Sequence, residues 1–272
     1  MSVTLSWRLG DGHVTVRIDE ESSEIPHFPS EQLCVMLSAT SHAMRPRCSL
    51  VIFDCDGVLV DSEPLEGLVM VNALRELGLT LSLDEWMVAY KGWKLADCLA
   101  HLGTRLGRPL PGDFAANYRA RSAEVFRREL QAMPGVLSAL AHIPVPVCVA
   151  SNGPREKIIL NLTITGLLRY FDKRVFSAYE IDSWKPDPGL FLHAATSCGV
   201  PPAECVVVED SETGIRAGIA AGMRVLAYGT LAEGKEFEAL GATLFTDMAA
   251  LPSLLGHAPY PVISNQSGKS NQ

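Results

Sequence analysis

Short apolar runs that end in polar residues predict the strands of this chain. The clearest run covers residues 50–53, where Leu, Val, Ile and Phe stand together before Asp54. An uninterrupted apolar run of this length is typical of a parallel strand that is buried on both faces. Similar runs predict further strands over residues 145–150, 175–177, 205–208, 224–227 and 243–245.

Helical spacing of apolar residues alternates with these strands after Gly135. It predicts helices over residues 154–168, 188–198, 213–221 and 248–255. Regular alternation of strands and helices is typical of a doubly wound parallel sheet, and the predicted class is therefore α/β.

An all-helical block separates the first predicted strand from the second. One helix opens near Pro64 and ends at Gly78, and others are predicted over residues 83–90, 95–106 and 113–132. This block predicts an inserted helical domain, residues 64–132. The core domain would then consist of residues 47–63 and 133–258.

The two ends of the chain differ from this pattern. Residues 1–46 mix turn formers and charges without a sustained period, which predicts a weakly ordered extension, although alternating Val14, Val16 and Ile18 also allow a hairpin. We hypothesise that the natural start codon is Met44, and native peptides upstream of it would reject this. The polar residues 259–272 are predicted to be disordered.

Composition narrows the classes of partner. The chain has 272 residues, 47% hydrophobic, with a net charge of -8 and no Lys/Arg block, which argues against nucleic-acid and anionic-membrane partners. Its seven cysteines form no CxxC pair, so neither a disulfide framework nor a zinc site is indicated. We expect a cytoplasmic protein with no membrane segment and no obligate protein partner.

Two acids follow the first predicted strand directly. In an extended backbone, side chains two residues apart face the same side, so Asp54 and Asp56 point one way. Gly57 then permits a sharp turn. The carboxyl ends of strands form the ligand crevice of an open α/β sheet, which favours a chemical role over the alternative of a helix cap or turn.

Three further polar features follow strands or open helices. Ser151 and Asn152 precede a helix, where backbone N–H groups can bind phosphate, although an ordinary helix cap has the same appearance. Lys185 lies in a proline-rich loop, and alone it would be read as a surface lysine. Glu209 and Asp210 end a buried strand, although acids also favour helix starts.

Together these features place four carboxylates and one lysine at one sheet edge. Two charges about 6 Å apart repel by about 3 kcal/mol at an effective dielectric near 20, so the cluster requires a cation. Hard oxygen ligands without nearby His or Cys favour Mg²⁺, which binds through a few carboxylates and substrate phosphate.

The motifs resemble those of a known family. DCDGVLVDSE, the Ser of VASN, the Lys of WKPDP and the EDS of VVVEDSETGI resemble the four ordered motifs of the haloacid dehalogenase (HAD) superfamily of phosphohydrolases, with a helical cap inserted after the first. The resemblance covers roughly residues 48–257. YKGWKL, VASNGP, FSAYEIDSWKPDP and FLHAA are similar to its 6-phosphogluconate phosphatase and β-phosphoglucomutase-like branch.

The resemblance implies a HAD-like Rossmannoid core and a covalent mechanism. Asp54 would attack phosphorus and form an aspartyl-phosphate. Asp56 would protonate the leaving alkoxide and then activate water. Ser151 and Asn152 would hold phosphoryl oxygens, and Lys185 would neutralise charge on Asp54 and phosphate.

The resemblance also implies a set of Mg²⁺ ligands. Asp54, the Asp56 carbonyl and Asp210 would bind the ion. Glu209 would be either a ligand or a partner of one.

Other activities on the same fold are open alternatives. A dehalogenase proper lacks the second acid of the first motif, so Asp56 argues against it. A β-phosphoglucomutase would have a cap histidine twelve residues after the nucleophile, where this chain has Glu66. A phosphonatase would need a cap lysine such as Lys91 or Lys94. A silent phosphate-binding regulator would be favoured by loss of a motif acid, and none is lost.

The resemblance also implies that the cap recognises the part of the substrate that lies beyond the phosphate group. In the family's helical-cap members, the loop at residues 90–95 does this, and Lys91 and Lys94 flank Gly92 there. A basic loop suits the carboxylate of a phosphorylated sugar acid such as 6-phosphogluconate. Surface lysines at helix ends are the alternative interpretation.

Overall fold

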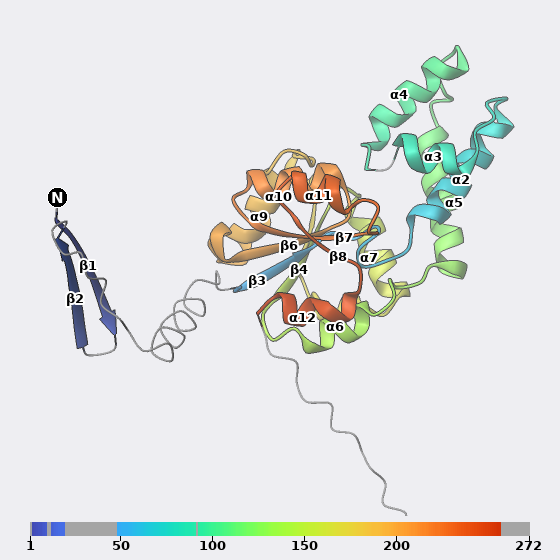
Figure 1. Cartoon of the computed structure of the whole chain (residues 1–272). Helices are drawn as coiled ribbons and strands as arrows, with labels where there is room; N and C mark the ends of the chain where they lie inside the picture. Colours follow the sequence, from blue (N-terminus) through green and yellow to red (C-terminus); the bar gives the residue numbers. More distant parts are fainter. Residues whose placement is uncertain (1, 10–11, 20–47, 91, 257–272) are drawn as a thin grey trace, which may run out of the picture. The chain divides into compact units, whose positions relative to one another are not determined.

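The computed structural model describes residues 2–9, 12–19, 48–90 and 92–256. The chain divides into two units, residues 1–45 and residues 46–272. In the first, β1 (Ser2–Leu9) pairs antiparallel with β2 (Gly12–Asp19) (Figure 1). This hairpin is the alternative that the alternating valines allowed. The predictions for residues 20–46 and 259–272 lie outside the described residues.

A six-stranded parallel sheet forms the centre of the second unit, in the order β5-β4-β3-β6-β7-β8. The strands are β3 (Leu50–Phe53), β4 (Val147–Ser151), β5 (Val175–Ser177), β6 (Cys205–Glu209), β7 (Arg224–Tyr228) and β8 (Thr243–Phe245). Every strand predicted from apolar runs is confirmed to within two residues at each end. β3 lies in the middle, with Phe53 opposite Val149 of β4 and Val208 of β6.

Helices cover both faces of this sheet, as the doubly wound class requires (Figure 1). Val51 and Phe53 face a cluster with α6 (Val136–His142), α7 (Arg155–Ile164) and α12 (Leu251–Leu254). Leu50 and Ile52 face a second cluster, with α9 (Gly189–Ser197), α10 (Glu212–Ala220) and α11 (Gly234–Ala239). Because successive residues of β3 are buried on opposite faces, the α/β doubly wound fold is confirmed.

The sequence missed three short helices: α6, α8 (Ala178–Ile181) and α11. None is longer than seven residues. Two turns are too short for apolar spacing to establish a helical period. Three 3-10 segments complete the described core, at Leu168–Tyr170, Pro202–Glu204 and Met248–Ala250.

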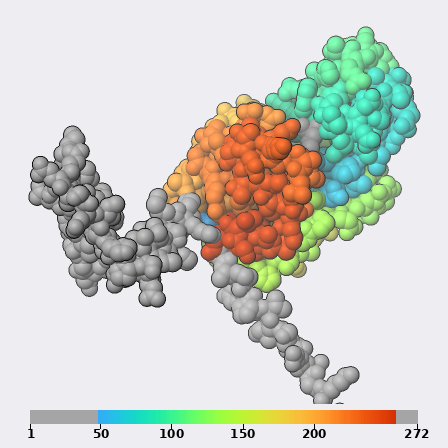
Figure 2. Space-filling model, in the orientation of Figure 1, coloured from blue at the N-terminus to red at the C-terminus, as the bar shows by residue number. Residues whose placement is uncertain are grey.

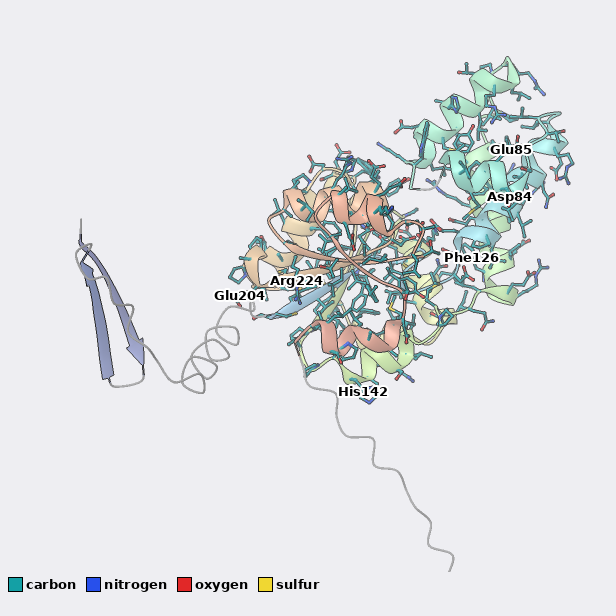
Figure 3. All side chains as sticks on the ribbon, viewed as in Figure 1. Asp84, Glu85, Phe126, His142, Glu204 and Arg224 are labelled. Atoms are coloured by element: carbon teal, nitrogen blue, oxygen red, sulfur yellow. The ribbon has the colours of Figure 1, made fainter. Side chains whose placement is uncertain are left out.

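The predicted helical insertion lies between β3 and β4. It consists of α2 (Glu63–Glu76), α3 (Leu83–Tyr90), α4 (Leu95–Leu106) and α5 (Phe114–Glu129), and Figure 2 shows it as a blue-green lobe. Met70, Leu74 and Leu102 belong to its own buried cluster. Phe126, labelled in Figure 3, is 1% exposed and belongs to the core cluster instead, so α5 also packs on the core.

The limits of the insertion at residues 64 and 132 stay a prediction. Within the described segments, no helix combines the length and apolar character needed to cross a membrane.

Candidate active site

Asp54 lies where β3 ends, at the carboxyl edge of the sheet. Its backbone N–H donates to the Val208 carbonyl at 2.9 Å, which continues the pairing with β6 for one more residue. Its side chain accepts a hydrogen bond from Lys185, and the same Nζ donates to Glu209 Oε1 at 2.6 Å. The structure therefore brings these three residues together from distant segments of the sequence.

The loop that carries Lys185 is held by Asn152. The Lys185 backbone N–H donates to Asn152 Oδ1 at 2.9 Å, and Asn152 Nδ2 donates back to the Lys185 carbonyl at 3.4 Å. Both ends of the Asn152 amide are thus engaged by the lysine loop. The side chain of Asn152 positions Lys185, which sequence reasoning missed because the two residues lie 33 positions apart. Its predicted phosphate contact stays a prediction.

Ser151 ends β4 beside this loop. Its buried hydroxyl accepts from the Gly153 N–H at 3.0 Å, while Ser177 Oγ donates to the Gly153 carbonyl at 2.6 Å. The turn therefore has a fixed shape before α7 begins at Arg155. The first backbone N–H groups of a helix have no partner within it, so this end of α7 suits an anion.

Glu209 and Asp210 occupy different environments although they are neighbours. Glu209 Oε2 accepts from the Asp210 and Ser211 N–H groups at 3.0 and 3.2 Å, and Oε1 accepts from Lys185. Asp210 instead lies against Gly57, where a Cβ would stand 2.2 Å from Oδ2. Gly57 also has φ +77°, so the turn and the close approach both require glycine.

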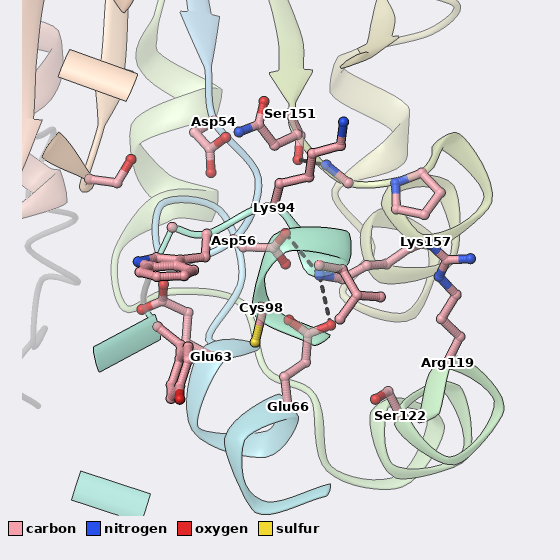
Figure 4. Close-up of a pocket in the computed structure, with 18 of the residues that line it drawn as sticks. Asp54, Asp56, Glu63, Glu66, Lys94, Cys98, Arg119, Ser122, Ser151 and Lys157 are labelled. Atoms are coloured by element: carbon pink, nitrogen blue, oxygen red, sulfur yellow. Dashed lines mark hydrogen bonds and ion pairs between the residues drawn. The ribbon is translucent and has the colours of Figure 1, made fainter. Parts of the chain in front are cut away.

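Asp56 is held by two side chains, neither of which the sequence analysis identified. Ser62 Oγ donates to Oδ1 at 2.5 Å, and Lys157 Nζ donates to Oδ2 at 3.0 Å. Lys157 also pairs with Glu66 of α2 at 2.8 Å (Figure 4). A lysine in the first turn of a helix opposes the helix dipole, and this was the signal available in the sequence.

Burial dominates the electrostatics of the acidic cluster. It raises the pKa of Asp54 well above its usual range, Lys185 opposes this, and Glu209 adds to it. Burial alone would lower the pKa of Lys185, but Asp54 and Glu209 outweigh it and raise that pKa. Lys185 is therefore held as a cation between two acids.

These residues line a cavity of about 600 Å³ between the core and the insertion (Figure 4). Lys94 contributes from the insertion, with its Nζ 3.6 Å from the centre of the Trp184 ring. Sequence reasoning missed Arg119, which donates to Tyr179 Oη at 3.3 Å across the same cavity. Lys91 lies outside the described residues.

The acids at the sheet edge offer oxygen donors that could hold a metal ion. Among the described residues, no three His, Cys, Asp or Glu side chains form a group arranged to hold a metal. The carboxylates of Asp54 and Asp210 and the Asp56 carbonyl are hard oxygens of the kind Mg²⁺ prefers. Because Asp210 abuts the turn at Gly57, these donors approach one another.

The ion pairs of Lys185 with Asp54 and Glu209 predict different effects of two substitutions on stability. Lys185→Met should lower the free energy of unfolding by about 3–5 kcal/mol, because it leaves Asp54 and Glu209 buried without their cation. Asp54→Asn should melt no lower than wild type in EDTA at pH 7. Because folding raises the pKa of Asp54, this acid lowers the free energy of unfolding at every pH above its unfolded pKa, which includes pH 7. The neutral amide of the variant removes that cost.

Thermal and urea unfolding in EDTA would check both variants. The exposed Lys235 of α11 does not line the cavity, so Lys235→Met is the matched control and should be neutral. A lower melting temperature for Asp54→Asn, or a neutral Lys185→Met, would contradict this account of the cluster.

Comparison with known proteins agrees with the motifs. Residues 48–222 match the family model for haloacid dehalogenase-like hydrolases. The chain is 38% identical over 209 residues to 6-phosphogluconate phosphatase of Escherichia coli (strain K12), covering 76% of this chain and 95% of that protein.

Solved structures share the fold. A haloacid dehalogenase-like protein of Agrobacterium tumefaciens str. C58 has a TM-score of 0.68 and 33% identity, over 77% of this chain and 98% of that one. A HAD family hydrolase of Deinococcus radiodurans R1 with bound phosphate and sodium has a TM-score of 0.64 and 30% identity, over 79% and 100%. The family resemblance of the motifs is confirmed, and this chain belongs to the haloacid dehalogenase-like hydrolase family.

Proposed function

We propose that this hydrolase removes phosphate from a small phosphorylated sugar acid, with 6-phosphogluconate as the best candidate. The enzyme is a phosphomonoester hydrolase, as its family and its sugar phosphatase relatives support. The observation that carries the proposal is the meeting of Asp54, Lys185 and Ser151 in one cavity that the insertion also lines. The relative named as a 6-phosphogluconate phosphatase supports the choice of substrate.

Asp54 would be the nucleophile of the first step. Its carboxylate oxygen forms a bond to phosphorus while the bond from phosphorus to the sugar oxygen breaks, which leaves an aspartyl-phosphate and a free sugar alcohol. Lys185 contacts Asp54 and would balance the charge on both the carboxylate and the phosphoryl group. The Ser151 hydroxyl and the start of α7 would hold phosphoryl oxygens.

Asp56 would move the protons of both steps. It gives a proton to the leaving sugar oxygen and then takes one from the water that attacks the aspartyl-phosphate, so it returns to its first state. Its position two residues after the nucleophile, with Gly57 turning the chain behind it, supports this assignment.

Magnesium would be held by Asp54, Asp210 and the Asp56 carbonyl. A bound Mg²⁺ would supply positive charge to the phosphate and to the acidic cluster. Glu209 would not bind the ion directly, because both of its oxygens already accept hydrogen bonds from Lys185, the backbone and Ser211. Its role is then to hold Lys185.

A phosphosugar mutase is the second candidate on this fold. Glu66 stands where the mutase resemblance requires a histidine, and its carboxylate pairs with Lys157. An acid paired with a lysine does not replace an imidazole that exchanges protons near neutral pH. This observation favours hydrolysis.

Asp54→Asn should abolish turnover, because an amide keeps the shape of the carboxylate but is not a nucleophile. The measurement is the burst and steady-state release of p-nitrophenol from p-nitrophenyl phosphate with Mg²⁺. Both phases should disappear in the variant. Steady-state turnover close to that of wild type would rule out the covalent mechanism.

Mg²⁺ should be required for activity. EDTA should abolish hydrolysis, and Asp210→Ala should raise the Mg²⁺ concentration needed for half-maximal activity, because one proposed ligand is lost. A titration of activity against Mg²⁺ measures this, with Lys235→Ala as control. Full activity in excess EDTA would refute the proposed metal site.

Lys94→Ala should reduce discrimination in favour of a sugar acid. A charged hydrogen bond from Lys94 to the substrate carboxylate is worth roughly 1.5–3 kcal/mol, or about 10- to 150-fold in kcat/KM. We expect this loss with 6-phosphogluconate and a much smaller one with glucose 6-phosphate, which lacks the carboxylate.

Steady-state kinetics on both substrates would test this, beside a screen of phosphorylated sugars, sugar acids and nucleotides. If hydrolysis of both substrates falls together, or neither falls, Lys94 does not read a carboxylate. The screen would then identify the substrate class directly.

A further inference from the structure

A lysine that the proposed mechanism does not use connects Asp56 to the helical insertion. Lys157 is the third residue of α7, and its Nζ lies 3.0 Å from Asp56 Oδ2 and 2.8 Å from Glu66 Oε1 (Figure 4). About a fifth of each side chain is exposed, at 22% for Lys157, 21% for Asp56 and 22% for Glu66. The three groups therefore lie at the inner wall of the cavity.

Two donors fix the orientation of the Asp56 carboxylate. Ser62 Oγ donates to Oδ1 and Lys157 Nζ donates to Oδ2, so each oxygen has its own partner. A carboxylate held by one oxygen can turn about its Cβ–Cγ bond, whereas one held by both cannot turn without breaking a hydrogen bond. Lys157 thus supplies half of the constraint on the proposed proton carrier.

Glu66 acts on the other side of the lysine. It lies in the first turn of α2, within the insertion, and Lys157 stands between it and Asp56. Glu66 and Asp56 are like charges that repel, so their connection is the shared ammonium. The lysine also lies near the positive end of α7, and two carboxylates offset that unfavourable position.

We propose that Lys157 is a positioning residue for the proton transfer assigned to Asp56, and that Glu66 influences Asp56 through Lys157. This inference rests on the proposed phosphatase function. It adds a connection between the insertion and the acid–base residue that the four motifs do not contain.

The nature of the leaving group separates this role from a structural one. A sugar alkoxide needs a proton to leave, whereas p-nitrophenolate leaves readily without one. Misplacing the acid should therefore slow phosphoryl transfer from sugar phosphates more than transfer from p-nitrophenyl phosphate. A general loss of folding or of cavity shape would slow both.

Lys157→Met should slow phosphoryl transfer from 6-phosphogluconate about 10- to 100-fold, the cost of misplacing a reacting group by about 1 Å. Transfer from p-nitrophenyl phosphate should change less than threefold. Rapid-quench single-turnover assays on both substrates, with Mg²⁺ and enzyme in excess, measure the step. Lys157→Arg keeps the charge and should recover most of the loss, and Lys235→Met should equal wild type. Equal losses on both substrates would overturn the proposal.

Two double variants test whether Glu66 acts on Asp56 through Lys157, and Lys157 through Asp56. Adding Lys157→Met to Asp56→Asn should not change the ratio of the two transfer rates further, because the group being positioned is already gone. Adding Glu66→Gln to Lys157→Met should likewise cost less than twofold. Losses that multiply in either double variant would show that Lys157 or Glu66 acts independently of Asp56.

The wild-type assay separates failure of this inference from failure of the proposed function. Without p-nitrophenol release that depends on Asp54, the chain is not acting as the proposed phosphatase, and both proposals fall. If wild type prefers another sugar phosphate, that substrate replaces 6-phosphogluconate in the assay. Only the leaving-group pattern of Lys157→Met then decides the inference.

Discussion

The site depends on the placement of one ammonium group among buried carboxylates. Lys185 has 2% of its side chain exposed and contacts both Asp54 and Glu209. Without that cation, the two acids would face each other across a few ångströms in a poorly solvated site, where repulsion is several times stronger than in water. Nearby hydrogen bonds hold this cation and its partners in place. Asn152 accepts from the Lys185 backbone N–H, and Glu209 accepts from the Asp210 backbone N–H.

The buried strands behind the cluster hold its charged residues in fixed positions. β3 is apolar on both faces and central in the sheet, so its end cannot move independently of β4 and β6. Parallel strands also bring residues that are far apart in sequence to one edge. The helical insertion then adds a second wall, with Phe126 packing it against the core.

Local sequence determined how much could be predicted. Asp54, Asp56 and Gly57 are informative because strand, acids and turn lie within a few residues, and each strand end was predictable from its own apolar run. The bonds between Asn152 and Lys185 could not be predicted, because 33 residues separate them and either side chain has an ordinary surface interpretation. Lys157 lies 101 residues from Asp56, and no local pattern pairs them.

The two lysines suggest why the two aspartates differ chemically. Each bridges a pair of acids, but Lys185 and Asp54 are 2% and 12% exposed, whereas Lys157 and Asp56 are 22% and 21% exposed. The proposed nucleophile, Asp54, needs a carboxylate held in one position, and contact with the buried ammonium of Lys185 holds it there. A proton carrier must instead exchange with substrate and water, so its partner has to lie at an accessible wall. The partner of Lys157 on the insertion is Glu66, so this ion pair physically connects the insertion to Asp56, the proposed proton carrier.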